Sequence, residues 1–404
     1  MQTRFTEALR AVPSGREAEA ILRSCVHCGF CTATCPTYLL LGDELDGPRG
    51  RIYLIKQALE GEPVSARTRL HLDRCLTCRA CETACPSGVR YGRLLDIGRE
   101  FVEAKAPRAP ASRLGRALLR GFLTGTWFAP VYQLGQALRA WLPGSMQRLV
   151  MARRAPRARP VRQLARRVVL PEGCVQRGMA PSIGAASARV LDRIGLCIDP
   201  RSRAGGCCGA IRQHLGDPEG ALQAARRNID AWEPALADGA EAVVSNASGC
   251  GVMLKQYGEL LAGDPAYAER ARRMSAAVRD LSEVVAAGPS LALRPDAVRR
   301  LVVHAPCTLQ HGQRLAGRVE ALVRSLGVEP LPAPDGHLCC GSAGTYSLLQ
   351  GTLSKQLRAR KLVALRSADP ELILSSNIGC IAHLGAAAPV PVRHWIEWLD
   401  DSLA

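Results

Sequence analysis

Residues 25–36 read CVHCGFCTATCP, and residues 75–86 read CLTCRACETACP. In both stretches the four cysteines follow the spacing C-x2-C-x2-C-x3-C, and a proline comes directly after the last one. Three thiolates spaced in this way bind one iron–sulfur cluster, and the fourth ligates the other cluster of a two-cluster protein. The two stretches therefore predict a domain over residues 1–105 that holds two [4Fe–4S] clusters.

The ligand sets are expected to cross over between the two stretches. Zinc is the alternative metal because thiolates suit both, but zinc sites typically use paired C-x2-C units with four ligands in all. The helical spacing of Ile52, Ile55 and Leu59 between the stretches predicts that the domain is helical. The predicted ligands of the first cluster are Cys25, Cys28, Cys31 and Cys85, and those of the second are Cys75, Cys78, Cys81 and Cys35.

The last 240 residues or so contain one series of landmarks twice. Cys307 follows Cys174 by 133 residues, the pair Cys339-Cys340 follows Cys207-Cys208 by 132, and Cys380 follows Cys250 by 130. A nearly constant offset of this size indicates a duplicated domain and not the short period of a solenoid. We predict a first repeat over residues 166–290 and a second over 291–404.

Each repeat also alternates two kinds of local pattern. Short apolar runs such as 301–303 and 372–374 are typical of buried strands, whereas Val319, Leu322, Val323 and Leu326 recur with helical spacing. This alternation predicts an α/β structure with parallel strands, whose ligands lie at the strand ends. The predicted fold class is thus mixed α+β and α/β: a helical ferredoxin domain followed by a duplicated α/β Cys-Cys-Gly domain.

The adjacent cysteines of each repeat are better explained as ligands of one metal centre than as a disulfide. Neighbouring Cα atoms are about 3.8 Å apart, which is below the usual range for a disulfide. Glycine after each pair would let the backbone approach a metal closely. The alternative is that these cysteines are only buried apolar residues, as we expect for the unmatched Cys197. The candidate ligands of an additional cluster are Cys174, Cys207, Cys208, Cys250, Cys307, Cys339, Cys340 and Cys380.

Charge is concentrated between the two cysteine-rich parts. The formal net charge is +17, and residues 105–167 contain fourteen basic residues and no acidic one. We predict a basic, partly apolar helical connector over 106–165, which is either a solvated linker or a surface for anionic lipid or an acidic partner. No nucleic-acid-binding motif accompanies the charge. The uncharged run 121–138 predicts a helix pair or a membrane-facing patch, and we favour burial.

Composition and targeting signals predict a cytoplasmic protein. Residues 1–23 lack the apolar core of a signal peptide, and no window offers about 20 uninterrupted apolar residues. Thiols stay reduced in the cytoplasm, so seventeen cysteines are expected to be metal ligands and not disulfides.

With two ferredoxin motifs and two Cys-Cys-Gly domains, the chain resembles the iron–sulfur subunits of glycolate oxidase. It is similar also to those of anaerobic glycerol-3-phosphate dehydrogenase and to the related component of heterodisulfide reductase. The stretches 48–51 (PRGR), 246–251 (NASGCG) and 376–380 (SNIGC) look most like the glycolate oxidase member. Heterodisulfide reductase ends each repeat with C-x2-C, where this chain has Met253 and His383. His383 could still ligate iron as imidazole does in Rieske centres.

The resemblance implies an electron-transfer subunit inside a dehydrogenase complex. Flavoprotein partner subunits would oxidise glycolate or a similar 2-hydroxy acid, and this chain would pass single electrons onward to a quinone or another membrane acceptor. We find no G-x-G-x-x-G after a strand, so we expect no flavin or NAD on this chain and no catalytic residue in it. It could lie peripherally on the inner face of the cytoplasmic membrane. Glycerol 3-phosphate, lactate and thiol/disulfide chemistry are the alternatives.

Overall fold

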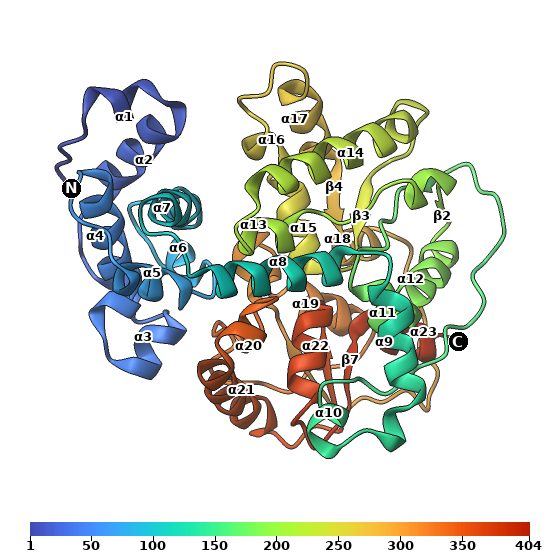
Figure 1. Ribbon diagram of the computed structural model, residues 1–404. Helices are drawn as coiled ribbons and strands as arrows, with labels where there is room; N and C mark the ends of the chain where they lie inside the picture. Colours follow the sequence, from blue (N-terminus) through green and yellow to red (C-terminus); the bar gives the residue numbers. More distant parts are fainter. The chain divides into compact units, whose positions relative to one another are not determined.

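The computed structural model describes residues 1–404, apart from the side chain of Ser145 (Figure 1). The chain divides into two compact units. Unit 1 comprises residues 1–116 and 337–361, and unit 2 comprises residues 117–336 and 362–404. The second Cys-Cys-Gly segment therefore belongs to unit 1, whereas the sequence predicts it as an internal part of the second repeat.

Unit 1 is built from helices around one core. Proline is the first residue of three of them, where its fixed φ favours helix and no amide donor is lost. The predicted apolar face of Ile52, Ile55 and Leu59 is buried in that core. The predicted helical domain is confirmed. Its helices are α1 (Glu7–Ala11), α2 (Pro13–Ser24), η1 (Phe30–Thr32), α3 (Pro36–Leu41), η2 (Glu44–Asp46), α4 (Pro48–Leu59), α5 (Ala66–Asp73), α6 (Ala80–Thr83) and α7 (Tyr91–Lys105). Unit 1 also contains α20 (Tyr346–Leu349) and most of α21 (Gly351–Arg366).

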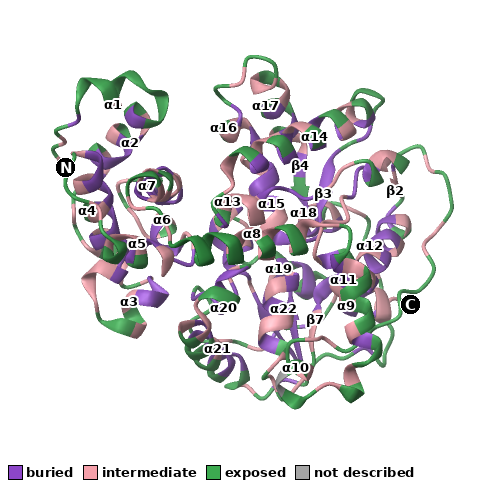
Figure 2. Cartoon of the chain, in the orientation of Figure 1, coloured by how far each residue is buried: buried purple, intermediate pink, exposed green. Residues whose placement is uncertain are grey.

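The segment between the cysteine-rich parts forms helices that lie mostly at the surface (Figure 2). The run 121–138 contains the end of one helix and the whole of a second, and the expectation that this run is buried is wrong. Only Phe128 and Gln136 are buried there, because α9 (Phe128–Ala137) packs on α11 (Gln176–Met179) through these two side chains and its other apolar residues are left uncovered. The helices are α8 (Pro110–Thr124), α9 (Phe128–Ala137), η3 (Arg139–Trp141) and α10 (Gly144–Gln147).

Most of the basic side chains of this segment pair with acidic groups of the chain itself. Arg157, for example, bonds Asp400 at 2.7 Å, and Arg159 bonds Glu172 at 2.7 Å. The excess charge is therefore largely engaged in surface ion pairs, which stabilise only weakly. The nine paired residues of 105–167 are Arg108, Arg116, Arg120, Arg154, Arg157, Arg159, Arg162, Arg166 and Arg167.

The first repeat contains four short parallel strands. β1 (Arg167–Val168) pairs with β2 (Cys197–Ile198), and β3 (Val243–Ser245) pairs with β4 (Val278–Asp280). A parallel bridge from Val169 to Val243 joins the two pairs, so the order across them is β2-β1-β3-β4. The helices of this repeat are α11 (Gln176–Met179), α12 (Pro181–Arg193), η4 (Pro200–Arg203), α13 (Ala210–His214), α14 (Pro218–Ala237), α15 (Ser248–Lys255), α16 (Tyr257–Leu260), α17 (Ala268–Ala277) and α18 (Leu281–Ala286).

The second repeat has the same strand order. β5 (Leu301–His304), β6 (Leu372–Ser375) and β7 (Val392–His394) form a parallel sheet, and a parallel bridge from Val302 to Leu331 adds a fourth position beside β5. Equivalent segments of the two repeats thus occupy equivalent places, which confirms the duplicated α/β fold. The further helices are η5 (Thr308–Gly312), α19 (Arg318–Ser325), α22 (Ile378–Gly385) and α23 (Trp395–Ser402).

One apolar core joins the sheets of the two repeats. Val168 and Val244 of the first repeat and Leu301 and Leu374 of the second belong to it, and α12 packs against α23. The opposite face of the first sheet packs on α14, α15 and α17 and forms a separate core. With both faces covered, the strands are continuous apolar runs, as parallel sheets require. Among the described residues, no helix is both long and apolar enough to cross a bilayer.

Candidate metal centres

The first group of cysteines surrounds Cys31. The pKa of Cys31 is raised to about 11, chiefly by burial and further by the neighbouring thiols Cys25, Cys28 and Cys85. The same four cysteines line one cavity of unit 1, together with Cys81. His27 and Gly29 have left-handed backbones, with φ of 57° and 86°, which folds the chain back between successive cysteines. The structure therefore brings together the four residues predicted for the first cluster.

The second group surrounds Cys81 and repeats this geometry. Burial raises the pKa of Cys81 well above its ordinary value, and the neighbouring thiols Cys78, Cys75 and Cys35 raise it further. Thr77 and Arg79 have φ of 54° and 60°, at the positions of His27 and Gly29. A left-handed backbone is uncommon outside glycine, so its recurrence marks a loop that wraps a fixed centre. These four cysteines are those predicted for the second cluster.

A buried cation lies beside this second group. The Arg51 guanidinium is 1% exposed, donates from Nη2 to Asp46 at 3.3 Å and approaches Cys35 Sγ at 4.0 Å. Burial opposes its charged form, but Cys75, Tyr91, Cys35 and Asp46 raise the pKa of Arg51 above its ordinary value. Tyr91 also donates its hydroxyl to Cys75 Sγ at 3.6 Å. Donors and a positive charge directed at sulfur fit thiolates that hold an anionic cluster.

Asp46 connects this cation to the rest of unit 1. It is fully buried and bonds His71 Nδ1 at 3.1 Å and Arg74 Nη1 at 2.8 Å. His71, which the sequence places near the clusters, is thus part of an ion-pair network. Sequence reasoning did not single out Arg51 or Asp46 as neighbours of the cysteines. The nearest signal was the stretch 48–51, which was noted only for its family resemblance.

The four cysteines of the first repeat also lie together. Cys174 donates to Cys207 Sγ at 3.4 Å, and Cys208 bonds both Cys207 and Cys250. Hydrogen bonds from the thiols of Cys174 and Cys208 hold the pKa of the Cys207 thiol well below its usual range. The same bonds, together with burial, raise the pKa values of the Cys174 and Cys208 thiols. Gly209, with φ of 96°, directs its amide to Cys207 Sγ at 3.4 Å. Four thiols with one shared proton network form a donor set for one metal centre.

A cavity adjoins these thiols. Cys208 and Cys250 line it together with Gln176 and Trp232. Gln176 Oε1 and Trp232 Nε1 are buried without a hydrogen-bond partner among the described residues. Buried polar atoms are normally satisfied, so an indole N–H in this wall fits a bound group that carries acceptors such as sulfide. The first repeat therefore fits the additional cluster that its cysteines predict.

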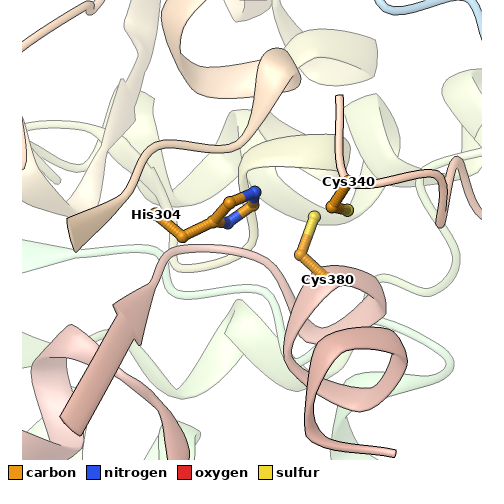
Figure 3. A group of neighbouring side chains, drawn as sticks. All are labelled: His304, Cys340 and Cys380. Carbon is orange, nitrogen blue, oxygen red and sulfur yellow. The ribbon is translucent and has the colours of Figure 1, made fainter. Parts of the chain in front are cut away.

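The second repeat places an imidazole among its cysteines. Figure 3 shows His304 at the end of β5, Cys380 on α22 and Cys340 on the loop of the Cys-Cys-Gly segment. One ligand atom of His304 and one of Cys380, both in unit 2, lie within 4.8 Å of each other, and both residues are buried. Sequence reasoning named Cys340 and Cys380 as candidate ligands but not His304. Its position in the run LVVHAPC, three residues before Cys307, was the available signal.

The remaining candidates of the second repeat are also placed by strand ends and turns. Cys307 is buried and precedes η5, and the Gly341 amide bonds Cys339 Sγ at 3.5 Å. His383 is half-buried on α22, one turn beyond Cys380, and is not part of the group in Figure 3. In the first repeat, Met253 is buried in the core on α14, α15 and α17. Cys197 lies in β2 and bonds the backbone of Leu164.

Comparisons with known proteins agree with these motifs. The family model of the 4Fe-4S dicluster domain matches residues 21–89, and that of the cysteine-rich domain matches residues 168–255 and 301–385. The chain is 51% identical to the glycolate oxidase iron-sulfur subunit of Escherichia coli (strain K12), over its whole length and 99% of the relative. It is 30% identical to the probable glycolate oxidase iron-sulfur subunit of Bacillus subtilis, over 91% of this chain and 89% of the relative. Lactate utilization protein A of Geobacillus thermodenitrificans is 30% identical over 54% of this chain and 92% of that protein.

Proposed function

Because the chain belongs to the family of glycolate oxidase iron–sulfur subunits, we propose that it passes single electrons from a flavoprotein partner to a quinone. The partner would oxidise glycolate to the 2-oxo acid. The observation that carries this proposal is the pair of four-cysteine groups in unit 1, one gathered around the half-buried Cys31 and the other around the buried Cys81. A [4Fe–4S] cluster supplies reversible one-electron transfer when it is bound to such thiolates.

The structure supports the crossed ligand sets. The thiol of Cys85, from the second stretch, raises the pKa of Cys31 in the first stretch. The thiol of Cys35, from the first stretch, likewise raises the pKa of Cys81 in the second. We therefore assign Cys25, Cys28, Cys31 and Cys85 to one cluster and Cys75, Cys78, Cys81 and Cys35 to the other. Arg51 and Tyr91 would favour the reduced form of the second cluster, because each offers a donor to its sulfur ligands.

The repeats are proposed to hold an additional iron–sulfur centre on the electron path. The support is the chain of four thiols in the first repeat and the polar cavity beside them. Cys174, Cys207, Cys208 and Cys250 would hold the group there. The equivalent cysteines of the second repeat are Cys307, Cys339, Cys340 and Cys380.

Glycolate is the proposed substrate of the complex because a relative named for glycolate oxidase matches the chain from end to end. Lactate is the second candidate, since lactate utilization protein A matches about half of the chain. Both are 2-hydroxy acids, and the substrate would bind on the flavoprotein. Glycolate-dependent or lactate-dependent reduction of the iron–sulfur signals in the reconstituted complex distinguishes the two.

Anaerobic iron and sulfide analysis with EPR tests the proposal on the full chain and on a Cys207→Ser/Cys339→Ser double variant. Two ferredoxin clusters alone give about eight irons per chain. We expect more than eight in the wild type, and the loss of one reduced signal in the double variant. A fully loaded wild type with about eight irons and an unchanged variant spectrum would contradict a working centre in the repeats. Fewer than about eight in every preparation would contradict the two-cluster assignment.

A further inference from the structure

The two repeats carry different residues three positions before their first cysteine. His304 ends β5 three residues before Cys307, and the equivalent position before Cys174 is Pro171. Proline has no side-chain donor atom, so the first repeat has no imidazole at this position. The second repeat adds a nitrogen ligand to its thiols. Equivalent backbones therefore present two different donor sets.

The fold fixes the position of His304 firmly. His304 is paired with Ser375 in the parallel register of β5 and β6, and it is only 1% exposed. The carboxyl end of β6 leads directly into α22, which carries Cys380. Both residues belong to unit 2, so the sheet itself brings the imidazole and the thiol together.

Hydrogen bonding selects the nitrogen that can bind a metal. His304 Nδ1 lies 3.0 Å from Ser375 Oγ. Metal-binding histidines characteristically donate the N–H of one ring nitrogen to an acceptor, which fixes the tautomer and orients the other nitrogen toward the metal. With the proton on Nδ1, Nε2 is the ligand atom.

We propose that His304 Nε2 is a ligand of the iron–sulfur centre of the second repeat, together with Cys380 of the same unit. This inference rests on the proposed function, because it requires a cluster in that repeat. The two repeats then hold centres of different chemistry, one bound by thiolates alone and one by thiolates and imidazole. Replacing an anionic thiolate by neutral imidazole raises the reduction potential, as it does in Rieske centres. The second repeat would therefore hold the more easily reduced of the two.

Pulsed EPR on the reduced full chain, labelled with 15N only in histidine, tests the assignment. The ferredoxin cysteines contribute no histidine nitrogen, so a strong 15N hyperfine coupling must come from a histidine ligand. We expect this coupling in the wild type. In His304→Cys the coupling should be lost while the iron content is kept, because thiolate can replace imidazole, and the midpoint potential of that centre should become more negative.

His383→Gln is the matched control, because His383 lies on the same helix as Cys380 and is the other candidate imidazole. It should leave the coupling unchanged. Coupling that persists in His304→Cys, or is lost in His383→Gln, overturns the role of His304 and leaves the proposed additional cluster intact. About eight irons with no further signal overturns both. Stoichiometric zinc bound through the second repeat, with no additional iron, overturns the cluster in that repeat.

Discussion

The single residues that control the environment of the proposed clusters are not the cysteines themselves. Arg51 is a fully buried cation, and its partners are a buried carboxylate and the sulfurs of the second group. Glycine at position 50 lets the first turn of α4 pack directly against the backbone of Glu44, because a Cβ at Gly50 would lie 2.1 Å from Glu44 O. A charge of this kind stabilises the fold only while it is paired, and it acts on any anionic group beside it.

Arg51→Met should destabilise the chain and lower the reduction potential of the second cluster. Removing one partner of a buried pair costs about 3 kcal/mol, and the lost positive charge no longer favours the reduced cluster. Thermal unfolding and an EPR-monitored redox titration measure the two effects. Lys56→Gln on the same helix is the control, since its i,i+4 pair with Glu60 contributes only about 0.5 kcal/mol. Equal potentials for the two variants would show that Arg51 does not act on the cluster.

Gly341→Ala should destabilise the second Cys-Cys-Gly segment more than Gly344→Ala. Both glycines have positive φ, of 88° and 60°, so each substitution costs about 1–2 kcal/mol of backbone strain. A Cβ at Gly341 would also lie 2.7 Å from Ser354 O and 2.8 Å from Leu357 Cβ, whereas nothing lies within 4 Å at Gly344. Chemical unfolding of both variants measures the difference. Equal losses would show that the close approach is relieved without cost.

At the scale of elements, the strand ends hold the candidate ligands, whereas one helix presents an exposed apolar face. The strands of each repeat present ligands where they end, as open parallel sheets do. Helix α8 instead has no buried residue, and Leu114, Leu118 and Phe122 recur on one exposed face. Trp127 and Trp141 nearby are 75% and 86% exposed. Since most of the basic side chains are paired within the chain, this apolar face and not the charge is the proposed contact with the membrane surface.

Leu118→Glu should abolish binding to vesicles of phosphatidylcholine and phosphatidylglycerol in a flotation assay. A carboxylate on the apolar face opposes its insertion between lipid headgroups. Val161→Glu is the control, because Val161 is 93% exposed but lies outside these helices. If Leu118→Glu floats like the wild type, the face is not a membrane contact. Loss of co-purification with the flavoprotein, with flotation unchanged, would assign the face to that partner.

At the scale of the whole molecule, the duplication lets each repeat complete the other. His394 at the end of β7 caps α23 and places Nε2 3.0 Å from the carbonyl of Asn246 in the first repeat. Asp280, its counterpart at the end of β4, accepts from Gln313 of the second repeat at 3.2 Å. The two polar contacts join the repeats beside their shared apolar core. Stability of unit 2 is therefore a joint property of both repeats.

Stability should fall as pH drops below about 6.5, and His394 should carry part of that loss. Burial lowers the pKa of His394 from 6.5 to about 3, although the bond to Asn246 opposes this. The unfolded chain then binds more protons than the folded one between these values, so the stabilisation is complete above 6.5 and is lost toward 3. Its upper limit is a few kcal/mol.

Chemical unfolding at about pH 7.5 and about pH 5.5, followed by far-UV circular dichroism, measures this dependence. His394→Asn keeps an N-cap side chain and removes the titrating ring. It should lower stability at the higher pH and flatten the dependence. The backbone amide of His394 and the Glu397 side chain would still bond, as they do in the wild type. If the free energy of unfolding of His394→Asn depends on pH as steeply as that of the wild type, His394 is not the source of the pH dependence.

The sequence by itself determined everything that depends on spacing. Eight cysteines in two identical patterns predicted the grouping of ligands, because the covalent distance between near neighbours limits which thiols can share a centre. The constant offset between Cys174 and Cys307, and between Cys250 and Cys380, predicted the duplicated fold. The alternation of apolar runs with helical patterns predicted the parallel strands.

Only the tertiary structure decided which distant residues surround those ligands. Arg51 approaches Cys35, and His304 at the end of β5 lies close to Cys380 after β6, although no local pattern distinguishes these side chains from others. Exposure of the run 121–138 was likewise decided by what covers it, which its own apolar composition does not encode. Spacing is a local property of the chain, whereas burial and charge neighbourhoods arise from contacts between segments far apart in sequence, and these form only in the folded molecule.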